Sequence, residues 1–165
     1  MCTPINVHSP TNKKTEEIKE EFYNLLEQNM NQIAGSDIKI ILGDFNAKVG
    51  KESIYKPTFG NESLHNETNN NRIKMIHFTI LKGFNVRNIT FPHKDIHKET
   101  WYSADGRTAN QIDRVLISNR FRSSITDLRV LRGPDIGLDH KLLKINFKVK
   151  LRVKIEKNIM GNEKL

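Results

Sequence analysis

Residues 38–46 have the sequence IKIILGDFN, and this stretch decides the fold. Its apolar, mostly β-branched first half predicts a buried strand that is broken by Gly43 and Asp44. Asp44 and Asn46 are two positions apart, so a persisting strand geometry would point both side chains to the same side. A carboxylate and an amide could then share one ligand. Taken alone, a Gly-Asp-x-Asn sequence is more often a simple turn.

The segment before this strand predicts a strand and a helix. Residues 5–9 are typical of a short strand that stops at Pro10. Thr15 is a suitable N-cap, and two glutamates follow it in the first turn, where the helix dipole favours acid. The apolar positions that share one helical face are Ile18, Phe22, Leu25 and Leu26. We expect this helix to extend to about residue 33 and to end at Gly35.

The segment after it predicts a loop, a second helix and several strands. Residues 51–71 are polar and rich in turn formers. The second helix is indicated by Ile73, Ile76, Ile80 and Leu81 and is closed by Gly83. Asp105-Gly106 is a hairpin signal. Strands are expected at about residues 85–91, 99–103, 110–118, 125–131 and 141–155. A strand–helix–strand unit followed by hairpins indicates a layered α/β or α+β sheet protein.

Composition limits the class of protein. The 165 residues are 36% hydrophobic and 28% charged, as in an ordinary globular domain. One cysteine excludes an internal disulfide and a cysteine zinc cage. There is no long apolar run and no leader with a basic start, so we expect a soluble intracellular protein, nuclear or cytoplasmic.

The formal net charge is +8, and most of the excess lies near the end of the chain. Residues 141–165 contain eight lysines and arginines against two glutamates. Such a basic stripe attracts polyanions, nucleic acid first among them. The alternative is an edge strand that its lysines keep soluble.

Two further polar sequences are candidates for chemistry. Asp113 interrupts an otherwise apolar strand, either as a site residue or because alternation places it on a solvated face with Gln111. Asp139 and His140 are adjacent after a turn, either as a site or as a plain loop. A carboxylate beside an imidazole supplies what phosphoester hydrolysis needs, because one group can hold a metal while the other exchanges a proton near neutral pH. His93 and His97 are four apart, but the stretch is typical of a loop and we do not expect it to bind metal.

Taken in order, these clusters resemble the later motifs of the endonuclease/exonuclease/phosphatase superfamily. The matching sequences are NVHSPT at 6–11, GDFN at 43–46, TW at 100–101, QID at 111–113 and GLDH at 137–140. The stretch from residue 91 to residue 135 resembles, more narrowly, the endonuclease of non-LTR (LINE-type) retrotransposons and the craniofacial development protein 2-like proteins. The resemblance covers about residues 4–150.

The resemblance implies a four-layer α-β-β-α sandwich, incomplete at the N-terminus, that cleaves phosphodiester bonds of DNA with Mg²⁺ or Mn²⁺. Asp44 would orient or deprotonate the attacking water, and Asn46 would bond to the phosphate or that water. His140, oriented by Asp113, would contact the scissile phosphate, and Asp139 would belong to the metal site. His8 would donate to a phosphate oxygen. The implied substrate-binding residues are Asn6, Thr11, Trp101 and Asn110.

Several departures from the family pattern matter. His8 stands where tyrosine is usual, Thr11 where asparagine is common, and Leu138 replaces a serine. The family's N-terminal portion, with its main metal-binding glutamate, has no counterpart here, so we expect weak metal binding. We expect a truncated domain over residues 1–155 and a polar tail over residues 156–165. Its partners would be DNA and, in a parent polyprotein, the N-terminal half or a reverse transcriptase domain.

Two functions therefore remain open from the sequence. The first is a retrotransposon-type endonuclease whose cleavage is impaired. The second is a basic nucleic-acid-binding remnant without catalysis. Relatives within the superfamily that hydrolyse inositol phosphates or sphingomyelin form a third possibility, which the basic charge disfavours.

Overall fold

The computed structural model describes residues 1–51, 60–66, 69–132 and 138–149. The elements, in chain order, are β1 Cys2–His8, α1 Glu16–Gln32, β2 Ile38–Asp44, α2 Asn70–Leu81, β3 Phe84–Val86, η2 Asp95–His97, β4 Trp101–Tyr102, β5 Ala109–Asn110, β6 Asp113–Ser118, η3 Asn119–Ser124, β7 Ile125–Val130 and β8 Leu143–Phe147. No helix among these residues is both long and apolar enough to cross a bilayer.

The central sheet has four strands in the order β1-β2-β6-β3. β1 and β2 are parallel, as their connection through α1 allows, and β6 is antiparallel to both of its neighbours. β4 and β5 form a small hairpin around Asp105-Gly106, which confirms the expected turn. β7 and β8 form a third, two-stranded sheet.

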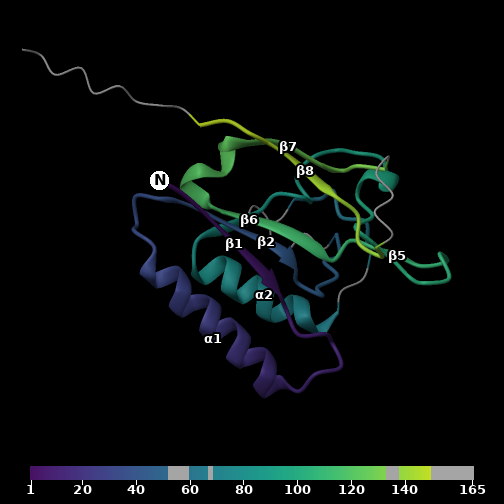
Figure 1. Ribbon diagram of the computed structural model, residues 1–165, viewed down its shortest axis with the longest axis horizontal. Coiled ribbons are helices and arrows are strands. Elements are labelled where there is room, and N and C mark those ends of the chain that lie inside the picture. Colours follow the sequence, from purple (N-terminus) through teal and green to yellow (C-terminus); the bar gives the residue numbers. More distant parts are fainter. Residues whose placement is uncertain (52–59, 67–68, 133–137, 150–165) are drawn as a thin grey trace, which may run out of the picture.

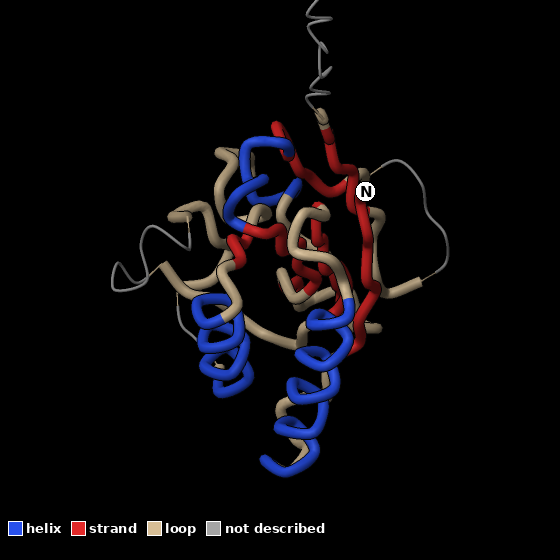
Figure 2. Tube along the Cα trace, turned by 90° about the vertical axis from the view of Figure 1, so that its left-hand side faces the viewer, coloured by secondary structure: helices blue, strands red, loops and turns tan. Residues whose placement is uncertain are grey.

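Two apolar cores hold these layers together. α1 and α2 cover one face of the sheet, through a core that includes Leu26, Ile41 and Met75. β7 and β8 lie against the other face, through a core that includes Ile40, Val115 and Leu128 (Figure 1). A turned view shows both helices side by side below the strands (Figure 2). The mixed α/β sandwich is therefore confirmed, and in the described part of the chain its α-helices lie on one face only.

The two helices form where expected but present different faces to the core. In α1 the buried apolar residues are Leu26 and Met30, whereas Ile18 and Leu25 are exposed. In α2, Met75, Ile76 and Phe78 are buried, while Leu81 is 80% exposed. Ile73 and Ile80 are also exposed. Each helix carries more apolar residues than its core contact needs, so spacing alone assigned the buried face wrongly.

The strands differ from expectation mainly in length. β2 continues through Gly43 to Asp44 instead of breaking there. Gly43 has φ +137°, and a Cβ on it would lie 1.9 Å from the Val7 carbonyl oxygen, so glycine allows β1 to pair at this point. The strands expected at 85–91 and 99–103 shorten to β3 and β4, and β8 lies within the described part of the strand expected at 141–155. The end of the last one, the tail at 156–165 and most of the C-terminal basic stripe lie outside the described residues.

Candidate active site

The site lies where three adjacent strands carry polar residues in register. His8 at the end of β1 is paired with Asp44 at the end of β2, and Asp44 is paired with Asp113 at the start of β6. Further along the same face of β2 and β6 lie Ile40, Val115 and Ile117, which belong to the core beneath β7 and β8. Because strand side chains alternate, this one face of the sheet is apolar along most of β2 and β6 and becomes acidic where β2 ends and β6 begins.

Asp44 is buried and is held by the residue two positions later. The Asn46 backbone N–H donates to Asp44 Oδ1 at 2.7 Å, and Asn46 Nδ2 donates to Asp44 Oδ2 at 3.1 Å. The same Nδ2 donates to the Ser9 carbonyl at 2.9 Å. Asn46 has φ +48°, a left-handed conformation that asparagine adopts more readily than most residues. The sequence GDFN thus contains the end of β2 and a hydrogen-bonded pair of side chains.

Burial raises the pKa of Asp44, and the nearby Asp113 carboxylate raises it further. The Asn46 N–H and the imidazoles of His140 and His8 act in the opposite direction. His8 Nδ1 lies 3.7 Å from Asp44 Oδ2, with the His8 side chain 76% exposed. A carboxylate with a raised pKa is a stronger base than an ordinary aspartate.

Asp113 and His140 form a direct pair. His140 Nδ1 lies 3.0 Å from Asp113 Oδ2 and 3.2 Å from Oδ1. The Asp113 backbone is fixed as well, because its N–H donates to Thr100 Oγ1 at 3.2 Å and its carbonyl accepts from Asn88 Nδ2 at 2.7 Å. With Nδ1 engaged by Asp113, His140 has Nε2 left for a substrate. The reading of Asp113 as a residue of a solvated strand face is wrong, since Gln111 is only 1% exposed.

Asp139 is held by the only tryptophan. Trp101 Nε1 donates to Asp139 Oδ2 at 2.8 Å, and this hydrogen bond is the main reason that the pKa of Asp139 is lowered. Trp101 also makes an isolated β-bridge with His140, and the Tyr102 N–H donates to the Asp139 carbonyl at 2.9 Å. The segment carrying Asp139 and His140 is therefore fastened along β4.

Three predicted substrate-binding residues lie at the margin of this cluster. Asn110 pairs with Trp101 and is buried, and its carbonyl accepts from the Thr100 N–H at 2.8 Å. Asn6 is exposed on β1, with its Oδ1 beside Gly43. Thr11 is exposed, and its carbonyl accepts from the Lys14 N–H at 3.1 Å. Among the described contacts, none joins Thr11 to Asp44 or His140, and substrate contact by all three stays a prediction.

Several contacts that support the site are not predicted from the sequence. Gln111 is buried, with its N–H donating to His65 Nε2 at 3.1 Å and its carbonyl accepting from Arg114 Nη2 at 2.6 Å. Arg114 Nη2 also donates to the Ala47 carbonyl at 2.8 Å. Burial lowers the pKa of His65 to about 4, so this imidazole is a neutral acceptor. No sequence signal identifies the contacts of His65 and Ala47, because both residues are far along the chain from Gln111 and Arg114.

The donors present suit an open metal site better than a closed one. Among the described residues, no group of three histidine, cysteine or acidic side chains could enclose a metal ion. Mg²⁺ often keeps several waters and binds through one or two carboxylates and a substrate phosphate. The exposed Asp139 carboxylate fits that limited role. His93 pairs with Asp127 at 2.6 Å.

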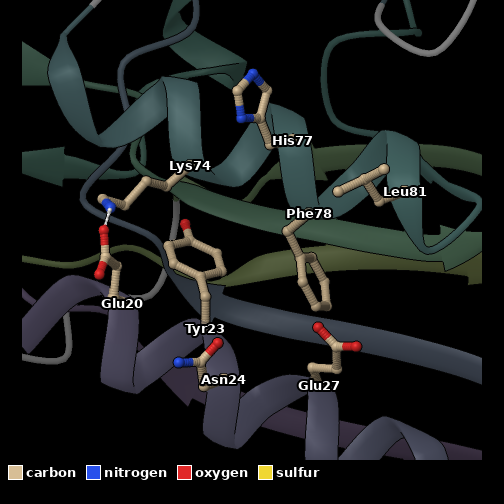
Figure 3. A pocket seen from close by; sticks show the side chains of 8 residues that line it. All are labelled: Glu20, Tyr23, Asn24, Glu27, Lys74, His77, Phe78 and Leu81. Atoms are coloured by element: carbon tan, nitrogen blue, oxygen red, sulfur yellow. Dashed lines mark hydrogen bonds and ion pairs between the residues drawn. The ribbon is translucent and has the colours of Figure 1, made fainter.

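A pocket of about 200 Å³ between α1 and α2 is separate from this cluster (Figure 3). Lys74 Nζ on α2 lies 3.0 Å from Glu20 Oε1 on α1. The rings of Tyr23 and Phe78, one from each helix, pack against each other with centroids 5.7 Å apart. The pocket lies on the helical side of the sheet, whereas Asp44 and Asp113 share the face of the β7–β8 core. It has no acid–imidazole pair of the kind formed by Asp113 and His140.

Two curated proteins similar to this chain have the same name in two mammals. The chain is 35% identical over 153 residues to craniofacial development protein 2 of Bos taurus and equally identical to that of Tragulus javanicus. It spans about a quarter of the length of these curated relatives, 25% and 26%. No family model matches the chain.

Two solved structures from Neisseria share the fold. A 3′ phosphatase bound to a product DNA hairpin has a TM-score of 0.58 at 18% identity, with 88% of this chain and 61% of that chain covered. A 3′-5′ exonuclease from Neisseria meningitidis has a TM-score of 0.53 at 17% identity, with the same coverage.

Proposed function

We propose that the chain belongs to the endonuclease/exonuclease/phosphatase superfamily and carries the catalytic groups of a retrotransposon-type endonuclease that cleaves phosphodiester bonds of DNA. The observation that supports this most directly is the Asp113–His140 pair beside Asp44 at one edge of the sheet. A DNA hairpin bound to the Neisseria phosphatase is in keeping with a nucleic-acid substrate.

The water-activating group would be Asp44. Its raised pKa suits a base that takes a proton from water, and its partner Asn46 fixes the orientation of the carboxylate. Both hydrogens of Asn46 Nδ2 are used, by Asp44 and by the Ser9 carbonyl. Asn46 would therefore act through Asp44, or accept a hydrogen bond from the water at Oδ1, rather than donate to the phosphate.

The phosphate would be bound by His140. Asp113 occupies Nδ1, so a hydrogen bond from Nε2 to a phosphate oxygen is the contact that remains. The exposed His8 would add a second donor at the same edge. Mg²⁺, when bound at Asp139, would neutralise charge on the phosphate. Positioning and charge neutralisation of this kind supply most of the catalysis in phosphoryl transfer.

The test is nicking of supercoiled plasmid by the intact gene product, with and without Mg²⁺. We expect Mg²⁺-dependent nicking that falls at least 100-fold in Asp44→Ala and in His140→Ala. A Gln28→Ala variant, changed at an exposed position of α1, is the control. Absence of nicking in the unmodified protein, or equal nicking in all variants, would contradict the proposal.

A second function is favoured by the exposed lysines of the last strand. Lys144 on β8 and Lys148 just after it are exposed, and Arg129 on the partner strand is exposed as well. A surface of this kind would bind DNA without cleaving it. Binding should then weaken with salt, and Lys144→Glu with Lys148→Glu should flatten the salt dependence by about one to two ions. If DNA binding does not depend on salt, these lysines do not bind DNA and only keep the edge strand soluble.

A further inference from the structure

Asn46 is held in place from outside the candidate active site. Its carbonyl accepts two side-chain hydrogen bonds, from Asn69 Nδ2 at 2.9 Å and from Asn71 Nδ2 at 3.3 Å. These two asparagines flank the first residue of α2 and follow Asn46 by more than twenty residues. The left-handed φ of +48° at Asn46 is therefore supported by contacts to its own carbonyl.

Asn71 connects the loops that follow β1 and β2. Its Nδ2 donates to the Pro10 carbonyl at 2.9 Å as well as to Asn46. Asn71 is 3% exposed, and its Oδ1 is buried without a hydrogen-bond partner. An unpaired buried acceptor is unfavourable, so the benefit of asparagine here lies in its amide donor.

Asn69 acts on the same loop from the helix N-terminus. It is the N-cap of α2, and its Oδ1 accepts from the Lys48 N–H at 3.1 Å. Its own N–H donates to the Lys48 carbonyl at 3.3 Å. Together with the bond from Nδ2 to Asn46, these contacts hold residues 46 and 48 against the start of α2.

We propose that Asn69 and Asn71 are positioning residues that fix Asn46, and through it the Asp44 carboxylate. The Asn46 N–H and Nδ2 reach Asp44 only while the Asn46 backbone keeps its left-handed conformation. Loss of either amide donor lets the Asn46 peptide turn and weakens both bonds to Asp44. The catalytic consequence rests on the proposed function, whereas the effect on the Asn46 conformation does not.

The experiment uses two near-isosteric variants of the intact gene product. Asn69→Asp keeps the acceptor for the Lys48 N–H but replaces the donor to Asn46 with an oxygen, at an N-cap position where Asn69 makes no side-chain capping hydrogen bond. Asn71→Asp places an oxygen against the carbonyls of Pro10 and Asn46. Asn70→Asp, at the exposed residue between them, is the matched control with the same added charge.

The first measurement is the NMR spectrum of Asn46, read through its Cα and Cβ shifts and its side-chain amide signals. We expect these signals to move in Asn69→Asp and Asn71→Asp and to stay in place in Asn70→Asp. The second is the rate of plasmid nicking, for which we expect kcat to fall about 10- to 100-fold with KM changed less than about threefold. Thermal unfolding identifies any variant that fails to fold. If Asn71→Asp does not fold, the proposal is judged on Asn69→Asp, which keeps the acceptor for the Lys48 N–H.

The outcomes separate the two proposals. Unchanged Asn46 signals in the folded Asn69→Asp variant, or equal changes in Asn70→Asp, would overturn the positioning role whatever the activity. Shifted Asn46 signals in a protein that never nicks DNA would support the positioning role and count against the nuclease. A fall in kcat/KM that comes entirely from KM would also overturn it, since positioning of Asp44 acts on the chemical step.

Discussion

His140 Nδ1 lies 3.0 Å from Asp113 Oδ2, although 27 residues separate the two in the chain. The contact exists because two fixed segments meet: β6 begins at Asp113, and the segment with His140 is bridged to Trp101 on β4. Thr100 joins them, since its Oγ1 accepts the Asp113 N–H and its carbonyl accepts the Lys141 N–H. The pair is thus held by backbone contacts on both sides.

This relationship predicts a large effect of Asp113→Asn on catalysis. An amide in place of the carboxylate removes the charge that orients His140 and favours the wrong imidazole tautomer. We expect the single-turnover rate of DNA nicking to fall about 100-fold or more. The control is Asp95→Asn, at an exposed aspartate whose Oδ1 lies 3.8 Å from Lys98 Nζ. A rate within threefold of the unmodified protein would show that His140 does not depend on Asp113.

The behaviour of His65 predicts a pH dependence of folding. Its pKa is about 4 in the folded protein against an ordinary 6.5, because burial and the nearby charges of Arg114 and Lys48 disfavour the imidazolium. The unfolded chain therefore binds more protons between these values, and stability is lost as pH falls from about 6.5 towards 4. For a partly exposed group we expect a loss of about 1–2 kcal/mol.

Urea unfolding at a series of pH values measures this loss. In His65→Gln, which keeps an acceptor for the Gln111 N–H, the decline between pH 6.5 and 4 should shrink by the same amount. His77→Gln, changed at an exposed histidine on α2, should leave the decline unaltered. Parallel pH profiles for His65→Gln and the unmodified protein would contradict the assignment.

The sequence predicts the central strands well but not the faces that they and the helices bury. Residues 38–42 are apolar enough to identify β2 without tertiary information. Arg114 shows the limit, because it is fully buried in β6 although its type favours the surface. Its burial is stabilised by the carbonyl of Gln111, three residues earlier, and by that of Ala47, which comes from a distant segment of the chain. Such compensation depends on the complete fold and leaves no local pattern.

The candidate site, too, has residues that the sequence predicts and residues that only the complete fold reveals. Asp44, Asn46, Asp113 and His140 could be named from the sequence because the motifs that carry them follow one another in an order that resembles a known superfamily, although each motif alone also fits a turn or a loop. Asn69 and Asn71 could not, since asparagines before a helix are ordinary caps and turn residues. Their bonds to Asn46 and Pro10 depend on where α2 meets the sheet.

The Trp101–Asp139 hydrogen bond predicts a change in titration. In Trp101→Phe the ring is kept but the Nε1 donor is lost, so the pKa of Asp139 should rise towards its usual 3.8. Carboxyl ¹³C NMR measures that pKa directly. Asp105 is the internal control, because its pKa is lowered by Ser103 and the Arg107 N–H, which the substitution does not touch. An unchanged Asp139 titration would mean that Trp101 Nε1 does not bond to this carboxylate in solution.

Gly43 predicts the sharpest effect on stability. A Cβ at this position would lie 1.9 Å from the Val7 carbonyl oxygen, and φ of +137° is strained for any other residue. Gly43→Ala should therefore push β1 away from β2 and lower the free energy of unfolding by about 3 kcal/mol or more.

Gly35→Ala is the matched control, since nothing lies within 4 Å of its Cβ position. There we expect little change or a gain of about 0.5 kcal/mol, because alanine restricts the unfolded chain. Urea denaturation measures both values, and equal stabilities of the two variants would mean that β1 does not approach Gly43 this closely. Since His8 is paired with Asp44 one residue further on, the same displacement should also separate their side chains.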